Sequence, residues 1–238
     1  MLETKNVKKL SVVIAAYNEE PRIENVLKIV VGHSLIDEVI VVDDCSHDKT
    51  SEVAARFNVK VLRNEKNLGK TLSVKKGVEV AKNDIIALLD ADLRGITREE
   101  ITMLANPVIE GKVDWTLSLR SNSWPWMKWV KMDWVSGERV IKKELLNDPL
   151  IWSRPEVGFG LETLMNKSLL GRQTKFCSVY LPTLTTERKS EKMGFFKGWY
   201  SDFKMVYLIM TVLPLYKVAG QFVQMAYLSN KYRKTLNV

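Results

Sequence analysis

The sequence predicts an α/β fold built on a doubly wound, mainly parallel sheet. Short apolar runs rich in β-branched residues alternate with segments of helical periodicity, and polar clusters follow several of those runs. With 238 residues, 46% hydrophobic and 27% charged, the chain is long enough for one substantial globular domain and a short appendage. In such a sheet ligands bind beyond the carboxyl ends of the strands, so the polar clusters there are the candidate site.

The first predicted unit is strand, helix, strand. Residues 10–16 (LSVVIAA) and 38–42 (EVIVV) are nearly unbroken apolar runs, which suit strands buried on both faces of a parallel sheet. Between them, residues 21–31 carry apolar side chains at helical spacing: Ile23, Val26, Leu27 and Val30. The two strands and the intervening helix therefore form a βαβ unit.

The same alternation continues along the chain. Further strands are expected at 59–62, 84–89 and 113–119, and further helices at 71–81 and 98–110. This continued pattern extends the doubly wound sheet to about residue 120.

The amino-acid composition changes near Arg120, because six of the seven tryptophans lie between Trp115 and Trp152. We expect one helix over residues 124–146 and another over 161–170. The aromatic cluster is expected to pack against the sheet edge, and an acceptor-binding wall is the alternative.

The charge is concentrated at the C-terminal end. The net charge is +8, and residues 187–238 hold nine basic and three acidic residues. We therefore divide the chain into a catalytic domain, 1–186, and a basic helical tail, 187–238. Such a tail can meet nucleic acid, anionic lipid or a phosphorylated acceptor, or it can be a solvated face.

Two further features bear on the compartment. Cys45 and Cys177 lie far apart and show neither a disulfide framework nor zinc-ligand spacing, which favours a reducing cytosol. The N-terminal apolar run is short and lacks a small-residue cleavage pattern, so no signal peptide is expected.

The tail contains an aromatic stripe at three- and four-residue steps. Its members are Phe196, Trp199, Tyr200, Phe203, Tyr207 and Met210. A helix at a membrane interface has this composition, although a helix docked on the catalytic domain would show the same stripe. The apolar run at 205–216 is shorter than the roughly 20 residues needed to span a bilayer, so we expect contact with the membrane surface.

Polar clusters follow the first and third predicted strands. Tyr17, Asn18 and Glu19 come where the first strand meets its helix, and backbone amides near a helix N-terminus can meet a base, ribose or phosphate. Gly69 permits close approach of the backbone, and Lys70 offers a cation for a diphosphate.

Another cluster follows the second strand. Asp43 and Asp44 can bind a pyrimidine N–H or ribose hydroxyls, while Ser46 and Asp48 can cap the following helix. His47 is expected to be a surface loop residue.

The most informative cluster ends the strand at 84–89. Asp90 and Asp92 are spaced i, i+2, so both carboxylates emerge into one polar crevice. Two carboxylates repel each other and favour a cation, which predicts Mg²⁺ or Mn²⁺ bridging a diphosphate. A polar strand end with a capping function is the alternative.

The segments VVIAAYNEE, EVIVVDDCSHDKT, NLGK and LLDADL, in this order, closely resemble the family 2 glycosyltransferases of the GT-A fold. This resemblance implies a nucleotide-diphospho-sugar donor. It also implies a nucleoside pocket formed by Tyr17, Asn18, Glu19 and Asp44, with Asp43 beside it. Gly69 and Lys70 would lie near the base and diphosphate. Asp90 and Asp92 would be the DxD pair. Of that pair, Asp92 is the firmer metal ligand, and Asp90 is shared between ribose and metal.

Two downstream segments resemble family members that glucosylate phosphoglycerate and, less closely, polyprenyl phosphates. By this resemblance Ser136, Gly137, Glu138 and Arg139 line the acceptor pocket, and Glu162 lies near the donor sugar. A guanidinium can bind a phosphate through two parallel hydrogen bonds, although an exposed helix charge is the alternative for Arg139.

The chain also departs from its relatives. The phosphoglycerate enzymes carry a metal-binding histidine in a late strand, but residues 181–189 (LPTLTTERK) contain none. The QxxRW motif of the processive synthases is absent as well, so polysaccharide polymerisation is not expected.

These features predict transfer of a hexose from a UDP- or GDP-sugar to a lipid-linked polyprenyl phosphate, by a protein peripheral at the cytoplasmic face of the cell membrane. Asp92, Lys70 and Glu162 are the predicted catalytic residues, and Glu162 is the expected base if the acceptor is a neutral hydroxyl. The alternative acceptor is a small soluble phosphorylated acid such as phosphoglycerate. A nucleic-acid-binding module, which is not favoured, leaves Asp90 and Asp92 unexplained.

Overall fold

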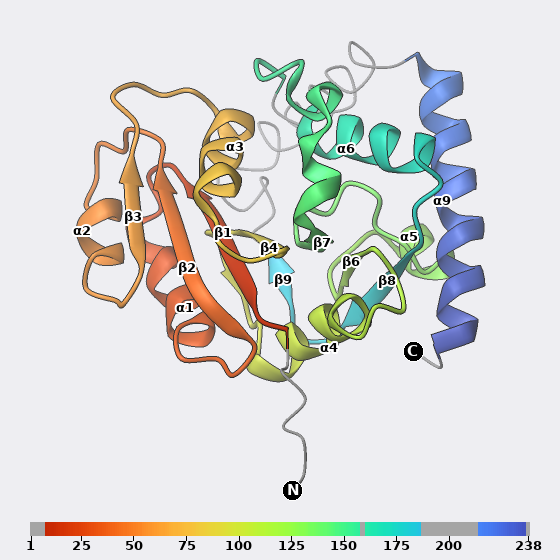
Figure 1. Ribbon diagram of the computed structural model, residues 1–238, viewed down its shortest axis with the longest axis horizontal. Helices are drawn as coiled ribbons and strands as arrows, with labels where there is room; N and C mark the ends of the chain where they lie inside the picture. Colours follow the sequence, from red (N-terminus) through yellow and green to blue (C-terminus); the bar gives the residue numbers. More distant parts are fainter. Residues whose placement is uncertain (1–7, 158–159, 187–213, 237–238) are drawn as a thin grey trace, which may run out of the picture.

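The computed structural model describes residues 8–157, 160–186 and 214–236 and shows one seven-stranded sheet (Figure 1). The strand order is β3-β2-β1-β4-β7-β6-β8. The strands are β1 (Leu10–Ala16), β2 (Ile36–Asp43), β3 (Lys60–Arg63), β4 (Ile85–Asp90), β6 (Trp115–Arg120), β7 (Arg139–Lys142) and β8 (Phe176–Leu181). Six of these strands run in the same direction, and β7 is antiparallel to both of its neighbours. The predicted mainly parallel α/β sheet is confirmed.

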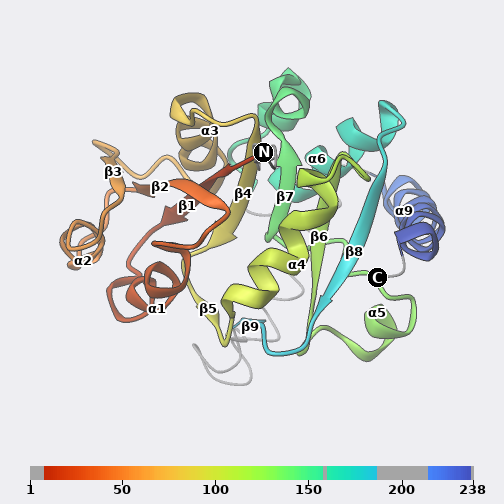
Figure 2. The same cartoon turned by 60° about the horizontal axis from the view of Figure 1, so that its bottom comes forward.

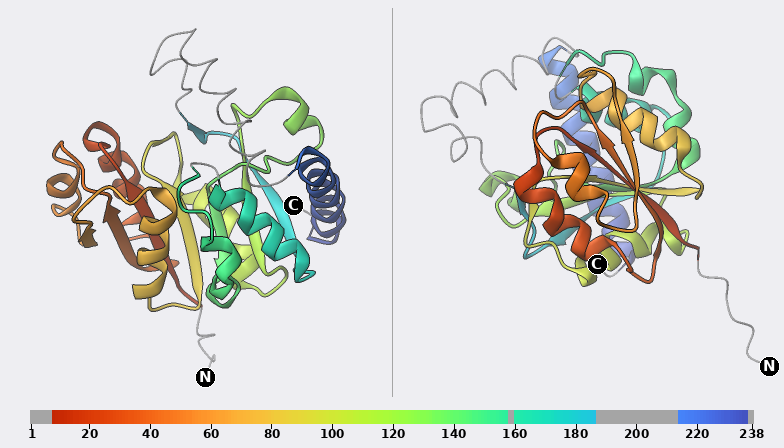
Figure 3. Two further views of the ribbon diagram at one scale, coloured as in Figure 1. Left: turned by 90° about the horizontal axis from the view of Figure 1, so that it is seen from above. Right: turned by 90° about the vertical axis from the view of Figure 1, so that its left-hand side faces the viewer.

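Helices cover both faces of the sheet (Figures 2 and 3). One face packs against α1 (Glu20–Val30) and α4 (Arg98–Ile109), and the other against α3 (Lys70–Val80) and α6 (Gly160–Gly171). The core therefore has two layers, because successive strand residues point to opposite faces. On β1, for example, Val12 and Ile14 join the α1 layer and Val13 joins the α3 layer.

Short elements complete the fold. They are α2 (Thr50–Ala54), α5 (Pro125–Trp129), the 3-10 helices η1 (Lys143–Asn147) and η2 (Pro149–Trp152), and a two-stranded ribbon of β5 (Leu93–Arg94) and β9 (Thr185–Thr186). Within the three described ranges, no helix is both long enough and apolar enough to cross a bilayer.

The expected helix over residues 124–146 is wrong. The chain forms α5, which ends at Trp129, then a loop, then β7, whose Val140 and Ile141 are buried in the sheet. The helix begins as expected for a proline in its first turn. It ends early because the following segment pairs with β4 and β6, and such distant partners leave no local periodicity in the sequence.

The six tryptophans within the described residues divide into two groups. Trp115 is fully buried and stacks on Phe176 with ring centroids 4.2 Å apart, and Trp134 and Trp152 pack against the core. The other three of these six are exposed: Trp124, Trp126 and Trp129. The expected packing of the aromatic cluster against the sheet therefore holds for only part of it.

The C-terminal helix α9 (Leu215–Leu236) packs against β8 and α6. Met225 is fully buried, and the Ser178 backbone N–H donates to Ser229 Oγ at 2.9 Å. A helix is therefore present in the predicted tail, and its inner face docks on the sheet domain. The aromatic stripe from Phe196 to Met210 lies outside the described residues.

Helix α3 approaches the sheet closely at Gly77. A Cβ at this position would lie 2.4 Å from Val13 Cγ1 and 3.2 Å from Val42 Cγ2. We expect Gly77→Ala to lower the free energy of unfolding by about 1–3 kcal/mol, because overpacking outweighs the better helix propensity of alanine. Thermal unfolding measures the effect, with Gly220→Ala in exposed α9 as the control that should not lower Tm, since its Cβ meets nothing within 4 Å.

Candidate active site

The predicted donor-binding residues gather at the carboxyl edge of the sheet. Tyr17, Asn18 and Glu19 follow β1, Asp44 follows β2, and Asp90 is the last residue of β4. Because these strands are parallel neighbours, with Ala16 opposite Asp43 and Ala15 opposite Asp90, their polar ends lie together. This edge is where α/β sheets bind their ligands.

Hydrogen bonds join the loops after β1 and β2. The Asn18 backbone N–H donates to Ser46 Oγ at 2.9 Å, and Asn18 Oδ1 accepts from the His47 N–H at 2.8 Å. The Glu19 N–H donates to Thr50 Oγ1 at 2.8 Å. Asn18 has a φ of +55°, a conformation that asparagine tolerates better than most residues. The two loops therefore form one fixed platform.

Tyr17 and Glu19 lie at the rim of this platform. The Tyr17 ring is 42% exposed and meets the His47 ring edge-on at 6.3 Å between centroids. The Glu19 carboxylate accepts a hydrogen bond from Arg22 Nη1 at 2.8 Å. An exposed aromatic ring and a carboxylate are suitable groups for a nucleoside, and that role stays a prediction.

Asp44 anchors the loop that leads to Lys70. Its Oδ1 accepts from the Leu68 N–H and from Asn64 Nδ2, and its Oδ2 accepts from the Gly69 N–H, each at 2.8 Å. The carboxylate is 3% exposed. These protein donors already bond to both carboxylate oxygens of Asp44. Contact between Asp44 and a base or ribose stays a prediction.

Asp43 is fully buried and organises the loop after β2. Its Oδ1 accepts from the backbone N–H and the hydroxyl of Ser46, and its Oδ2 accepts from the Ser51 hydroxyl. Asp43 therefore helps to fix this platform, and a direct contact with the donor stays a prediction.

We expect Asp44→Ala to raise the donor KM about tenfold while lowering kcat less. The substitution leaves two backbone N–H groups without their acceptor, which costs about 1–3 kcal/mol and releases the loop before Lys70. Initial rates over a range of donor concentrations measure both constants. An unchanged KM with a collapsed kcat would instead assign Asp44 to the chemical step.

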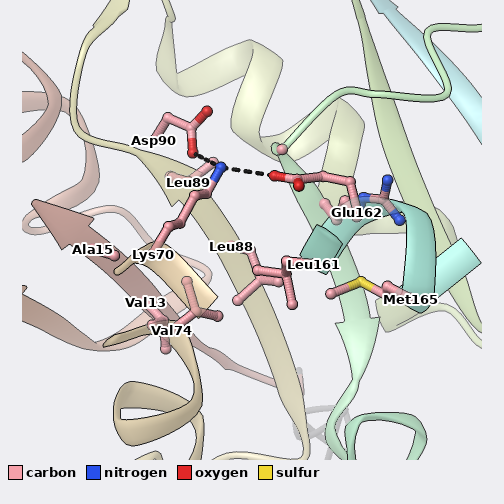
Figure 4. A pocket seen from close by; sticks show the side chains of 12 residues that line it. Val13, Ala15, Lys70, Val74, Leu88, Leu89, Asp90, Leu161, Glu162 and Met165 are labelled. Carbon is pink, nitrogen blue, oxygen red and sulfur yellow. Dashed lines mark hydrogen bonds and ion pairs between the residues drawn. The ribbon is translucent and has the colours of Figure 1, made fainter. Parts of the chain in front are cut away.

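Lys70 lies between two carboxylates that come from different elements (Figure 4). It begins α3, and its Nζ lies 2.7 Å from Asp90 Oδ1 at the end of β4 and 2.8 Å from Glu162 Oε1 in the first turn of α6. Burial alone would lower the pKa of Lys70, but the charges of Asp90 and Glu162 raise its pKa overall. The lysine is therefore a cation at neutral pH.

Glu162 is 4% exposed, and its Oε2 has no hydrogen-bond partner among the described residues. The carboxylate borders a small pocket beside apolar side chains, which Figure 4 shows: Val13, Val74, Leu88, Leu161 and Met165. A buried carboxylate with an unused oxygen can accept a further hydrogen bond from a bound ligand.

Gly137 brings the 134–138 loop against this group. A Cβ at Gly137 would lie 2.9 Å from both Asp90 Oδ2 and Lys70 Nζ. The predicted acceptor loop is therefore in contact with the predicted donor site, and glycine permits that approach.

Arg139 is fully buried and bonded to the protein. Its guanidinium donates to the Ser136 carbonyl at 3.0 Å, to Asn166 Oδ1 at 2.6 Å and to the Trp134 carbonyl at 3.4 Å. Burial lowers the pKa of Arg139 to about 10, although the negative charge of Glu162 acts to raise it. Arg139 therefore remains charged at neutral pH. Arg139 holds the loop in place, and a direct contact with an acceptor phosphate stays a prediction that requires these bonds to be exchanged.

Ser136 and Glu138 belong to a buried polar cluster at the end of β6. Glu138 Oε2 accepts from the hydroxyls of Ser118 and Ser136, each at 2.6 Å. Glu138 itself is fully buried, and its Oε1 lies 3.9 Å from Arg120 Nη1. Their contact with an acceptor stays a prediction.

Arg120 is a site residue that the sequence predictions missed. It ends β6 at the same edge as Asp90, and its Nη2 lies 2.9 Å from Asp133 Oδ2. Burial would lower the pKa of Arg120, but Glu138 and Asp133 raise it overall. The sequence contains a signal for Arg120, because this residue directly follows the predicted strand at 113–119. Polar residues directly after predicted strands are the other candidate site residues.

Asp90 and Asp92 offer two hard oxygen donors for a divalent cation. The described residues contain no group of three His, Cys, Asp or Glu side chains that could hold a metal, and Asp90 Oδ1 contacts Lys70. Mg²⁺ is often bound by one or two carboxylates and completed by substrate phosphates and water. The residues present therefore fit a cation that arrives with a diphosphate.

A mainly parallel sheet with a lysine and acidic residues at its carboxyl edge is typical of α/β proteins that bind ligands at that edge. Residues 11–169 match the sequence profile of Glycosyl transferase family 2, so the chain belongs to this family.

Curated relatives resemble part of the chain. A dolichol-phosphate mannosyltransferase of Pyrococcus furiosus is 35% identical over 92 residues, which cover 36% of this chain and 26% of the relative. An undecaprenyl-phosphate 4-deoxy-4-formamido-L-arabinose transferase of Aeromonas hydrophila is 38% identical over 117 residues, which cover 44% of this chain and 35% of the relative. The matches thus span well under half of the relatives' own length.

Solved structures of glucosyl-3-phosphoglycerate synthase from Mycobacterium tuberculosis resemble the chain over most of its length. One, with Mn²⁺, uridine-diphosphate-glucose and phosphoglyceric acid, has a TM-score of 0.66 at 20% identity and covers 86% of this chain and 79% of that one. Another holds Mg²⁺ and uridine-diphosphate and has a TM-score of 0.65 at 21% identity, with the same coverage of the two chains. At this identity the likeness establishes the GT-A fold.

Proposed function

We propose that this glycosyltransferase transfers a hexose from a UDP- or GDP-sugar to a lipid-linked phosphate at the cytoplasmic face of the membrane. The observation that carries the proposal is the Lys70 ammonium between Asp90 and Glu162, at the carboxyl edge of the sheet and in contact with the 134–138 loop. This arrangement supports the proposal because it sets a cation that can bind a diphosphate beside the loop proposed to bind the acceptor.

The reaction breaks the bond between the sugar C1 and the donor diphosphate and forms a bond from C1 to an acceptor phosphate oxygen. In this reaction Lys70 stabilises the negative charge that develops on the departing diphosphate. An acceptor phosphate is already anionic near neutral pH, so the step needs no strong general base. Glu162 then positions Lys70 and accepts a hydrogen bond from the sugar.

Asp90 and Asp92 would hold Mg²⁺ or Mn²⁺, which when bound neutralises the charge of the leaving diphosphate. Asp90 also fixes the Lys70 ammonium through their 2.7 Å contact. The two aspartates would therefore orient the donor and balance its charge.

Three observations favour a lipid-linked acceptor. The two relatives compared above are named as transferases that act on dolichol phosphate and undecaprenyl phosphate. The C-terminal tail is basic, and its net positive charge favours contact with an anionic surface. The expected metal-binding histidine of the phosphoglycerate enzymes is absent from residues 181–189.

A small phosphorylated acid is the second candidate acceptor. The likeness to glucosyl-3-phosphoglycerate synthase over 86% of this chain favours it. Transfer assays with both acceptors decide between the candidates.

A screen of nucleotide-sugars tests the donor half of the proposal. We expect one UDP- or GDP-sugar, with Mn²⁺, to raise Tm by several degrees and to be hydrolysed slowly, because binding to the folded state stabilises it. Sugars of other nucleotides serve as controls. Equal responses to every nucleotide-sugar, or none to any, would contradict a dedicated nucleoside pocket.

A further inference from the structure

We infer that an exposed aromatic patch on α5 and α9 docks the protein on an anionic lipid surface. The aromatic patch consists of Trp124, Trp126, Trp129, Tyr216, Val223 and Tyr227. The inference deepens the proposed function and rests on it for its purpose, because it names the surface that would bring a lipid-linked phosphate to the site.

The α5 part of the patch is unusually exposed for its residue type. Trp124 is 60% exposed, Trp126 47% and Trp129 83%. Tryptophan is highly buried on average, so three exposed rings in one short segment indicate a surface that binds something. Tryptophan is also the residue enriched where proteins meet the headgroup layer of a membrane.

Helix α9 presents one face inward and another outward. Gln221, Met225 and Ser229 are buried at four-residue steps. Tyr216, Val223 and Tyr227 lie on the outer face with 65% to 72% exposure. The inner face packs the helix against β8 and α6. The apolar outer stripe is therefore not needed for that packing.

The two parts of the patch are neighbours. The Trp126 ring contacts the Phe222 ring edge-on at 5.4 Å between centroids. Figures 2 and 3 show α5 beside α9 at the β8 end of the sheet. The exposed residues of α5 and α9 therefore belong to neighbouring parts of the surface.

The charges around the patch select the partner. Lys128, Lys131, Lys217 and Lys231 are exposed. No acidic residue occurs in residues 121–132 or in residues 214–238. Basic residues beside exposed tryptophans suit anionic headgroups. A symmetric dimer would instead place this basic face against itself, so a second copy of the chain is a poorer occupant.

The patch also lies near the catalytic edge. Strand β6 runs parallel to β4 and ends at Arg120, so α5 follows at the same edge of the sheet as Asp90. A membrane that meets α5 would therefore lie beside the edge that holds Lys70 and Asp90. The phosphate of a lipid-linked acceptor lies at headgroup depth, where such docking would present it.

Co-sedimentation of the full chain with vesicles tests the inference. We expect wild-type protein to bind phosphatidylcholine vesicles that contain phosphatidylglycerol and to bind pure phosphatidylcholine weakly. Trp124→Ser with Trp129→Ser, and separately Lys128→Glu with Lys131→Glu, should each weaken binding about tenfold or more. The matched control, Arg56→Glu with Lys60→Glu beside β3 at the opposite edge of the sheet, should bind like wild type.

Three results would overturn the inference: wild-type protein that ignores anionic vesicles, patch variants that bind as well as wild type, or a control that weakens as much as they do. Light scattering on the same proteins adds a fourth, because a wild-type dimer that the tryptophan substitutions convert to a monomer would assign the patch to a second copy. Thermal stabilisation by nucleotide-sugars, measured in parallel, separates the two proposals. If the donor binds and vesicles do not, the docking surface is wrong; if vesicles bind and no donor does, the proposed function is wrong.

Discussion

Asp92→Asn is expected to reduce sugar transfer by about a thousandfold or more while leaving the fold intact. The substitution removes one of the two carboxylate charges that would hold the divalent cation at the diphosphate, and such a loss costs several kcal/mol of transition-state stabilisation. Asp92 is only partly buried and follows the end of β4, so the core should not change. Initial rates at saturating donor and acceptor measure the effect, and thermal unfolding checks the fold.

Asp84→Asn is the matched control for that experiment. Asp84 is an exposed aspartate that precedes the same strand, so it lies at the opposite end of β4 from the candidate site. The control should keep wild-type activity. Activity of Asp92→Asn within about tenfold of wild type would exclude a metal-binding role for this residue, because about 1.4 kcal/mol is too small for a lost metal ligand.

Lys70→Met is expected to lower kcat about a hundredfold or more. The variant keeps an unbranched side chain but removes the ammonium that pairs with Asp90 and Glu162, so the departing diphosphate loses a nearby cation. It also leaves the buried Glu162 carboxylate without its ion partner, so Tm should fall as well.

A second substitution separates catalysis from stability in this case. Lys70→Met with Glu162→Gln removes both members of the ion pair, so most of the lost Tm should return while transfer stays low. Recovery of transfer together with Tm would show that Lys70 acts only by supporting the fold. Lys75→Met, on the same helix but outside the site, is the matched control.

The gathering of the predicted donor-binding residues at one edge of the sheet could be predicted from sequence, because it depends on local order along the chain. Each cluster directly follows a buried apolar run, and parallel strands bring such ends to one edge. The same criterion marks Arg120, which ends β6, and Asn64, which follows β3, and both were overlooked. The hydrogen-bond partners of the carboxylates could not be predicted from sequence. The contacts of Asp44 with Leu68 and Gly69, for example, depend on the conformation of the folded loop.

The structure of the predicted acceptor segment was harder to predict because it depends on distant partners. Ser136 and Arg139 fall inside the helix expected over residues 124–146, yet their segment forms a loop and an antiparallel strand. The partners of that strand, β4 and β6, are separated from it along the chain. For the same reason the sequence suggested an exposed or phosphate-facing Arg139, whereas the folded chain buries it against Asn166.

Transfer of labelled sugar into an organic-extractable product tests the central claim most directly. Full-length protein would be incubated with Mn²⁺, each labelled UDP- or GDP-hexose and a polyprenyl phosphate, with phosphoglycerate in parallel reactions. We expect label in the organic phase with one donor, dependent on both the lipid phosphate and the divalent cation, and absent for Asp92→Asn. Label that appears only in a water-soluble product with phosphoglycerate, or no transfer from any nucleotide-sugar to the lipid phosphate, would contradict it.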